Sequence, residues 1–312
     1  MREKTDLSFV VPCYRSEHTI TGVVNEIRTT MAQRPALRYE IILVCDGSPD
    51  QVYRVIRGLA AEDARIHGVE FARNFGQQAA VVAGLRLCSG EVAVCLDDDG
   101  QTPACEVFSL LDALTDEVDV VYASYLWNKK QHSAFRNFGS WMNEQMLRFF
   151  LRKPKGLEIT SFFAARRRVV DEICRYTGPY PYTEGLILRG FDRIVNVPVT
   201  HRARDEGTSG YTFRKLLSLW LNGFTAFSVI PLRVASVTGA ACAVGGFLYM
   251  LVIVVHHFID KDVPMGYSSL MAMLLLSCGI ILIMLGMVGE YIGRLYITNT
   301  NAPQYVVRSK TE

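Results

Sequence analysis

The stretch that decides the fold is 91-EVAVCLDDDGQTP-103, in which an apolar run is followed at once by three consecutive carboxylates. Residues 91–96 have the composition of a buried strand. Asp97, Asp98 and Asp99 then carry adjacent negative charges, which repel one another. Because like charges at the end of a buried strand need a compensating group, this stretch predicts a site for a charged ligand.

The same strand pattern recurs along the first 200 residues, where short apolar runs alternate with helical patterns. Near-continuous apolar strands separated by helices are typical of a largely parallel sheet covered on both faces. The expected fold class is therefore α/β, with a Rossmann-like, mostly parallel sheet. The expected strands cover 7–12, 39–46, 66–72, 91–98, 119–125 and 194–203, and the expected helices cover 20–31, 51–61 and 76–88.

Polar residues follow four of these strands at the point where each strand ends. Ligands of open parallel sheets bind outside the carboxyl ends of the strands. We therefore expect a single site there rather than four unrelated loops. The residues expected to meet at it are Pro12–Tyr14, Asp46–Ser48, Arg73–Asn74 and Asp97–Gln101.

The acidic run itself has the pattern of a metal site. Side chains alternate in direction along an extended segment, so Asp97 and Asp99 can converge on one cation while Asp98 points elsewhere. Gln101 continues the alternation and adds a neutral oxygen. Hard oxygen ligands suit Mg²⁺ or Mn²⁺, which commonly bridge protein carboxylates to substrate phosphates. The competing interpretation is a solvated acidic turn.

The sequence carries no dinucleotide or P-loop signature, because it has neither G-x-G-x-x-G after a strand nor G-x-x-x-x-G-K-[ST]. Single residues at the strand ends can still bind a nucleotide. Asp46 is a candidate partner for a base or ribose, with an Asx turn capping the next helix as the alternative. Arg73 and Asn74 precede a helix whose free N–H groups attract phosphate or sugar oxygens, although such an arginine is more often a surface ion-pair partner.

Two stretches without a charged residue, Val234–Val255 and Ser268–Gly289, contain 22 residues each. As helices they would be roughly 33 Å long against about 30 Å of hydrocarbon, which predicts two transmembrane helices. Lys and Arg flank the pair and are scarce between them, so both termini are expected in the cytoplasm. Segment 211–233 has apolar residues at helical spacing beside Arg214 and Lys215. It predicts an amphipathic helix in the membrane interface, or alternatively a plain core helix.

Bulk composition narrows the function classes further. The chain has 312 residues and a formal net charge of +2, which gives no support to nucleic-acid binding. The first residues lack an apolar core of signal-peptide length, so no cleaved signal is expected. The eight cysteines are scattered without C-x-x-C spacing, which favours a reducing compartment and no structural zinc. No motif specifies the oligomeric state, and a homo-oligomer stays open.

Six segments occur in an order and spacing that resemble the small polyisoprenyl-phosphate glycosyltransferases of glycosyltransferase family 2. They are VVPCYRSE, VCDGSPD, ARNFGQQAAVVAGL, LDDDGQTPACE, HRARDEGTSGYTFRKLLSL and MVGEYIGRLYITNTNAPQYVV. The chain is most similar to bacterial undecaprenyl-phosphate sugar transferases, with dolichyl-phosphate mannose synthase as a more distant relative. The resemblance implies a GT-A domain over 1–210, an amphipathic juxtamembrane region over 211–233, a transmembrane hairpin over 234–292 and a cytoplasmic tail over 293–312.

Together, the residue patterns and the resemblance assign site roles. The metal ligands are expected to be Asp97, Asp99 and Gln101. The nucleotide sugar is expected to contact Pro12, Tyr14, Asp46, Arg73, Asn74, Asp97 and Asp98. The acceptor phosphate is expected to contact Arg204, Ser209, Arg214 and Lys215. Asp99 and Arg204 are the two residues expected to carry catalysis.

The resemblance implies an inverting, metal-dependent transfer of one sugar from a nucleotide sugar, expected to be UDP-linked. The acceptor would be undecaprenyl or another polyisoprenyl phosphate, and the enzyme a multi-pass protein of the bacterial inner membrane. Ser161 and Phe163 stand where family members often have Asp and Arg, which leaves the catalytic base open. Glu184 could touch a sugar hydroxyl, although a surface carboxylate is the simpler interpretation.

Two other functions stay open, and Ser161 and Phe163 motivate the first of them. One is a non-catalytic, nucleotide-binding membrane scaffold or regulatory subunit. The other is an enzyme whose acceptor is a protein or a preassembled lipid-linked oligosaccharide. Transfer to a simple polyprenyl phosphate distinguishes both of them from the implied activity.

Overall fold

The structure is a computed structural model. It describes residues 5–125, 153–154, 156–178, 181–200, 266–299 and 303–311, together with residues 237, 239, 241, 244, 245, 248 and 255. Four residues expected at the acceptor phosphate, namely Arg204, Ser209, Arg214 and Lys215, lie outside the described residues. The expected amphipathic region 211–233 lies outside them as well.

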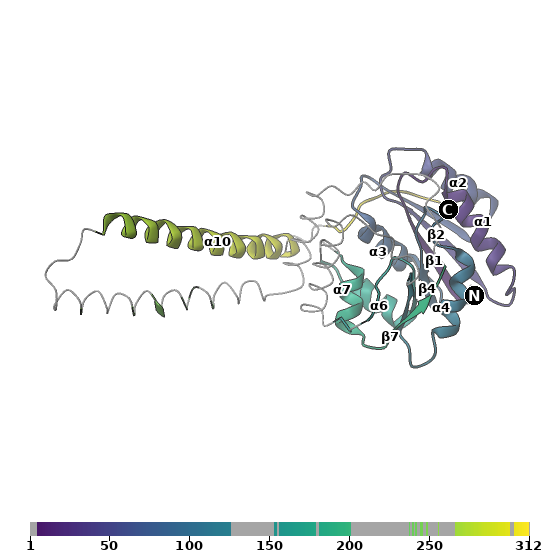
Figure 1. Ribbon diagram of the computed structural model, residues 1–312. Coiled ribbons are helices and arrows are strands. Elements are labelled where there is room, and N and C mark those ends of the chain that lie inside the picture. The colour runs from purple at the N-terminus through teal and green to yellow at the C-terminus, as the bar shows by residue number, and fades with distance from the viewer. Residues whose placement is uncertain are drawn as a thin grey trace. The chain divides into compact units, whose positions relative to one another are not determined.

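The described N-terminal part is built on an eight-stranded sheet with the order β7-β5-β6-β4-β1-β2-β3-β8 (Figure 1). Its strands are β1 Leu7–Cys13, β2 Tyr39–Cys45, β3 Ile66–Phe71, β4 Val92–Cys95, β5 Val120–Ser124, β6 Phe163–Arg166, β7 Ile194–Pro198 and β8 Val307–Lys310. The pairs β1–β2, β1–β4, β2–β3 and β5–β7 are parallel. The expected mostly parallel α/β sheet is confirmed.

Helices cover both faces of the sheet because its central strands are apolar on both sides; every residue of β1 is buried. One face packs on α1 Ile20–Met31, α2 Val52–Glu62, the short 3₁₀ helix η1 Ala104–Glu106 and α4 Val107–Ala113. The other packs on α3 Gln77–Leu87, α6 Arg167–Arg175 and α7 Thr183–Gly190. Figure 1 shows these two helical layers on opposite sides of the strands.

Strand β6 brings a distant segment to the end of β4. It runs antiparallel to β4, with Phe163 paired to Cys95 and Arg166 paired to Val92. Ser161 and Phe162 therefore enter the sheet at the edge where β4 ends and the acidic run begins. No periodic signal in 163–166 predicted this strand.

The last strand comes from the far end of the chain. Strand β8 pairs antiparallel with β3, and Val69 lies opposite Lys310. Tyr305 stacks on Phe71, with ring centroids 4.8 Å apart, and the Gln304 amide donates hydrogen bonds to two backbone carbonyls. Residues 301–312 thus belong to the same compact unit as residues 1–211, whereas the sequence predicted a separate tail over 293–312.

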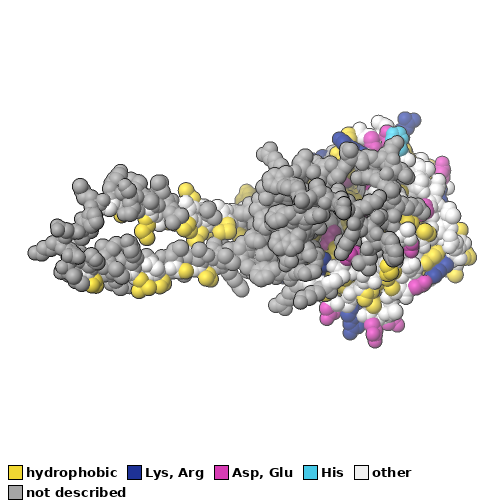
Figure 2. Space-filling model, in the orientation of Figure 1, with side chains coloured by type: hydrophobic (Ala, Val, Ile, Leu, Met, Phe, Trp, Pro, Cys, Tyr) yellow, Lys and Arg dark blue, Asp and Glu magenta, His cyan; other side chains and the backbone are white. Residues whose placement is uncertain are grey.

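Residues 212–300 form a second compact unit. Its described part contains α10 Tyr267–Asn299, which is 33 residues long and exposes large apolar side chains, among them Leu270, Leu282 and Leu295 (Figure 2). No helix among the described residues meets the combined length and apolarity required to cross a membrane. The two expected spans stay predictions.

Candidate active site

The candidate site lies at the edge where β1, β2, β3 and β4 end and β6 begins. The parallel register places these carboxyl ends side by side, since Pro12 and Cys13 pair with Val44 and Cys45. The polar residues that follow the four strands therefore come to one edge, as the sequence predicts.

Asp98 is held by two residues that follow β1. Its carboxylate accepts a hydrogen bond from the Tyr14 N–H at 2.9 Å, and its carbonyl accepts one from the Thr19 hydroxyl at 2.6 Å. Burial raises the pKa of Asp98 to about 6. Asp98, Asp97 and Asp99 thus have different hydrogen-bond partners, and the expected contact of Asp98 with a nucleotide sugar stays a prediction.

Asp97 is oriented by two neutral side chains. The Gln77 amide donates to its Oδ1 at 2.9 Å, and the Ser161 hydroxyl donates to its Oδ2. Gln77 is the first residue of α3, and Ser161 precedes β6, so the start of α3 and the segment before β6 each hold one oxygen of this carboxylate. Ser161, which departs from the family pattern, is thus a partner of the acidic run.

Asp99 and Gln101 are linked by a tight turn. The Gln101 N–H donates to Asp99 Oδ1 at 3.1 Å, and Gly100 between them has a φ of +72°. This local hydrogen bond is an Asx turn, which fixes the direction of the Asp99 side chain.

The chemistry of this donor set fits a divalent cation. No cluster of three or more His, Cys, Asp or Glu side chains suited to a metal occurs in the described part of the chain. Mg²⁺, however, is usually held by one or two carboxylates and completed by water and substrate phosphates. That requirement is met by the carboxylates of Asp97 and Asp99 together with the neutral amide of Gln101.

Asp46 fastens the loop that precedes α3. It is 3% exposed, and its two carboxylate oxygens accept the N–H groups of Phe75 and Gly76 at 2.7 and 2.9 Å. Burial raises the pKa of Asp46, and these two hydrogen bonds oppose the shift. From the sequence, two roles were open for Asp46: a contact with the nucleotide, or an Asx turn that caps α2. The structure shows a third role, a clamp on the β3–α3 loop, and the nucleotide contact stays a prediction.

Gly47 makes that clamp possible. It has a φ of +55°, and a Cβ there would lie 2.2 Å from the Arg73 carbonyl carbon and 2.5 Å from the Asn74 nitrogen. No side chain fits such a gap, so the β2 and β3 loops can meet only with glycine at this position.

The remaining residues expected at the nucleotide differ in exposure. Pro12 is buried, whereas Tyr14 is 43% exposed. Arg73 is exposed, and its guanidinium lies 4.7 Å from the centre of the Phe75 ring. Asn74 is also exposed and donates to the Asp46 carbonyl at 3.2 Å. These positions leave Tyr14 and Arg73 accessible at the edge.

A small cavity of about 60 Å³ lies beside Asp97. Besides Asp97 and Ser161 it is lined by Gln77, Gln78, Thr183 and Glu184. The sequence favoured a surface position for Glu184, and this is wrong. Its Oε2 is out of contact with solvent, and burial raises its pKa.

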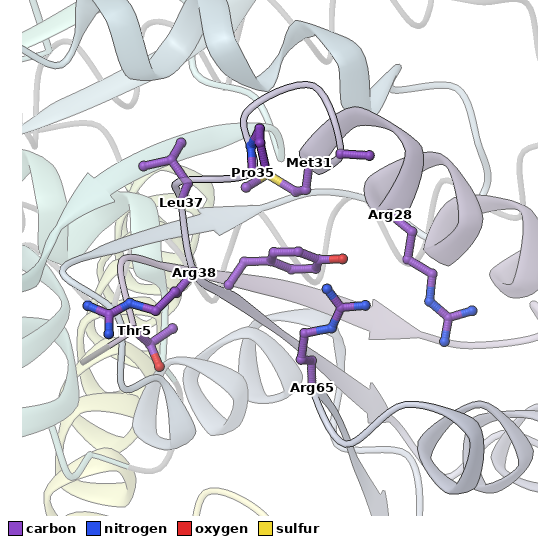
Figure 3. A pocket seen from close by; sticks show the side chains of 9 residues that line it. Thr5, Arg28, Met31, Pro35, Leu37, Arg38 and Arg65 are labelled. Atoms are coloured by element: carbon purple, nitrogen blue, oxygen red, sulfur yellow. The ribbon is translucent and has the colours of Figure 1, made fainter. Parts of the chain in front are cut away.

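A larger cavity, of about 590 Å³, lies at the opposite edge of the sheet, where β2 and β3 begin (Figure 3). It is lined by Arg28, Arg38, Tyr39 and Arg65. The charges there are already paired, because Asp63 bonds Arg28 at 3.1 Å and Arg65 at 2.8 Å. The Arg65 pair lowers the pKa of Asp63 to about 2. Although it is larger, this cavity is remote from the acidic run, and we assign it a structural role.

Comparison with known families identifies the class of protein. The model described as "Glycosyl transferase family 2" matches residues 8–174, and the one described as "GtrB C-terminal hairpin" matches residues 230–295. The chain belongs to glycosyltransferase family 2 and is a glycosyltransferase. This result favours an enzyme over the non-catalytic scaffold that the sequence left open.

Relatives and solved structures agree with this assignment. A Bacillus subtilis (strain 168) protein named "Uncharacterized glycosyltransferase YkcC" is 30% identical over 308 residues, covering 99% of this chain and 95% of the relative. Mannosyl-3-phosphoglycerate synthase from Rubrobacter xylanophilus is 16% identical with a TM-score of 0.51, over 73% of this chain and 74% of that one.

A third similar protein is glucosyl-3-phosphoglycerate synthase from Mycobacterium tuberculosis, solved in complex with Mn²⁺, UDP-glucose and phosphoglyceric acid. It is 17% identical with a TM-score of 0.51, over 72% of this chain and 78% of that one. At these identities, the two solved structures establish a shared fold.

Proposed function

We propose that this glycosyltransferase moves one sugar from a nucleoside diphosphate sugar, UDP-linked, to a polyisoprenyl phosphate such as undecaprenyl phosphate. The observation that carries the proposal is the acidic run at the end of β4, oriented by Gln77 and Ser161, in a chain that also matches the C-terminal hairpin model. The product would be a lipid-linked sugar for assembly or modification of cell-surface glycans.

Asp97, Asp99 and Gln101 would hold Mg²⁺ or Mn²⁺. When bound, this cation would neutralise charge on the departing nucleoside diphosphate. The M. tuberculosis structure with Mn²⁺ and UDP-glucose supports this choice of cation. Gln77 and Ser161 keep Asp97 in one orientation, and the turn at Gly100 does the same for Asp99.

The proposed acceptor explains why the site can work without a dedicated base. A phosphate monoester carries about −1.5 to −2 charges at neutral pH, so its oxygen needs little deprotonation. Ser161 therefore does not have to remove a proton, and its hydroxyl is available to orient Asp97. A single in-line displacement would invert the anomeric centre.

The membrane part of the proposal rests on the sequence and on the hairpin match. The uncharged stretches 234–255 and 268–289 both fall inside the matched residues 230–295. We propose that they anchor the enzyme in the bacterial cytoplasmic membrane, with the catalytic unit and both termini in the cytoplasm. Arg204 and Ser209, with Arg214 and Lys215, would contact the acceptor phosphate at headgroup height.

The test is transfer by the purified full-length chain. It would be given single UDP-sugars, Mn²⁺ or Mg²⁺ and undecaprenyl phosphate, and the lipid product would be identified by mass spectrometry. We expect a singly glycosylated lipid phosphate with at least one donor, and none in the presence of a chelator. Transfer only to a protein or to a preassembled lipid-linked oligosaccharide would contradict the proposed acceptor.

A second comparison separates Arg204 from Arg214, two of the four acceptor-phosphate candidates outside the described residues. We expect Arg204→Ala to impair transfer far more than Arg214→Ala, since Arg204 lies in the motif shared with the family and Arg214 has the character of a general membrane-surface contact. Equal losses in the two variants would remove the special role assigned to Arg204.

A further inference from the structure

Two neighbouring side chains in the small cavity beside Asp97 bury polar atoms that have no partner within the described part of the chain. Thr183, the first residue of α7, is 2% exposed, and its Oγ1 has no hydrogen bond. Oε2 of Glu184 is likewise buried without a partner. Both residues line the cavity together with Asp97 and Ser161. Buried polar atoms nearly always have a hydrogen-bond partner. The two unpaired oxygens in this cavity therefore need an explanation.

Gln78 holds both Thr183 and Glu184 in place through hydrogen bonds. Its Oε1 accepts the Thr183 N–H at 2.9 Å, and its Nε2 donates to Glu184 Oε1 at 3.0 Å. One amide from α3 thus fixes both the backbone of Thr183 and one oxygen of the Glu184 carboxyl. Among the residues that the structure describes, the second carboxyl oxygen and the threonine hydroxyl have no partner, which leaves both available to a ligand.

The size of the cavity defines what that partner can be. Its volume is about 60 Å³, which is small against the roughly 300 Å³ or more of a typical ligand pocket. This size suits one hydroxyl or hydroxymethyl group of a ligand better than a whole sugar ring. A carboxyl and a hydroxyl side by side can both accept and donate hydrogen bonds, which matches a sugar hydroxyl.

We propose that Thr183 and Glu184 form a specificity subsite for one hydrogen-bonding substituent of the donor sugar, with Gln78 as the positioning residue. The inference rests on the proposed function, because it takes the ligand beside Asp97 to be a nucleotide sugar. A site that pairs buried polar groups with a substrate hydroxyl rejects analogues that lack the hydroxyl, because these groups are then left unpaired.

The test compares binding of a nucleotide with binding of the corresponding nucleotide sugar. Full-length protein with Mn²⁺ is titrated with UDP, GDP, UDP-glucose, UDP-galactose, UDP-N-acetylglucosamine and GDP-mannose. The variants are Thr183→Val and Glu184→Met, which keep the approximate side-chain volume and remove the polar group. The matched controls are Thr29→Val and Glu172→Met, at exposed positions on α1 and α6.

For the best donor, we expect each subsite variant to bind the nucleotide sugar about tenfold more weakly while UDP or GDP binding stays within about twofold. The two controls should match the wild type. We also expect the Tm of Thr183→Val to be equal to or higher than that of the wild type. A buried hydroxyl without a hydrogen-bond partner does not stabilise the free protein.

Three results would overturn the inference. If nucleotide and nucleotide-sugar binding weaken equally, or if neither changes, Thr183 and Glu184 do not recognise the sugar. If the Tm of Thr183→Val falls clearly, its hydroxyl has a structural role. If the wild type binds nucleotides and none of the nucleotide sugars, or binds no nucleotide at all, the proposed function itself fails and the subsite with it.

Discussion

The Ser161 hydroxyl donates a hydrogen bond to Asp97, across the junction between β6 and β4. The serine hydroxyl is an uncharged donor, so it orients this carboxylate without neutralising it. Ser161 is therefore better understood as a positioning residue than as a degraded catalytic base.

That relationship predicts the effect of substituting Ser161. We expect Ser161→Ala to lower kcat/KM by about tenfold, because Asp97 loses a hydrogen bond that orients it. Ser161→Thr keeps the hydroxyl and should retain most of the activity. Initial rates of glycolipid formation at saturating Mn²⁺ measure both. An alanine variant as active as the wild type would show that this hydrogen bond is irrelevant to turnover.

Removing a carboxylate from the acidic run should have a much larger effect. We expect Asp99→Ala to lower the transfer rate by about a thousandfold or more, because charge on the leaving diphosphate is no longer stabilised. Its Tm should be unchanged. Asp116→Ala, at a fully exposed acidic position, is the control and should behave as the wild type. Near-normal turnover of Asp99→Ala would refute the metal assignment.

Asp46 provides a test of stability rather than of chemistry. We expect Asp46→Ala to lower the free energy of unfolding by about 2 kcal/mol or more, because the backbone N–H groups of Phe75 and Gly76 lose the carboxylate that accepts their hydrogen bonds. Asp112→Ala breaks an exposed ion pair with Arg34 and should cost less than about 1 kcal/mol. Denaturant unfolding of the full-length chain in detergent, followed by circular dichroism, measures both. Similar losses in the two variants would argue against the clamp.

The raised pKa of Asp98 predicts that the stability of the protein depends on pH. Its pKa rises from 3.8 to about 6 in the folded protein, so the folded state binds the proton more tightly than the unfolded chain does. The stability that this proton contributes is fully present below about pH 4 and is lost as the pH rises to about 6. Asp98→Asn keeps an acceptor for the Tyr14 N–H and has no charge to bury.

The Asp98→Asn variant, measured without divalent cations, should therefore gain stability relative to the wild type between pH 4 and pH 7. Above pH 7 the difference should be constant. Unfolding curves of both proteins at pH 4, 5, 6 and 7 give the comparison. A difference that does not change with pH would mean that the Asp98 carboxylate is not desolvated.

The sequence predicted the parallel core of the fold and the edge that carries the site, for a physical reason. Strands β1 to β4 are buried on both faces and are separated by amphipathic helices, so their pattern is local and strong. Strands β6 and β8 are four residues long and pair with partners distant in the sequence. No local pattern specifies such a pairing, so neither strand was predicted.

Within the site, the sequence located the acidic run but not the contacts that hold it. The separation of Asp98 from Asp97 follows from side-chain alternation, which a sequence displays directly. The clamp at Asp46 and the burial of Glu184 depend on which loops meet in space. The only available signal for the clamp was the glycine after Asp46, since a glycine following a strand end is typical of a close backbone approach.

Strand β8 has a consequence for how the protein is made. Residues 212–300 are synthesised before the strand that covers the outer edge of β3, and domains otherwise fold from the N-terminus onwards as they leave the ribosome. The sheet of the catalytic unit can thus be completed only after translation has passed through the whole hairpin. A nascent chain stalled before residue 307 would leave β3 as an open edge, competent to pair with a neighbouring polypeptide.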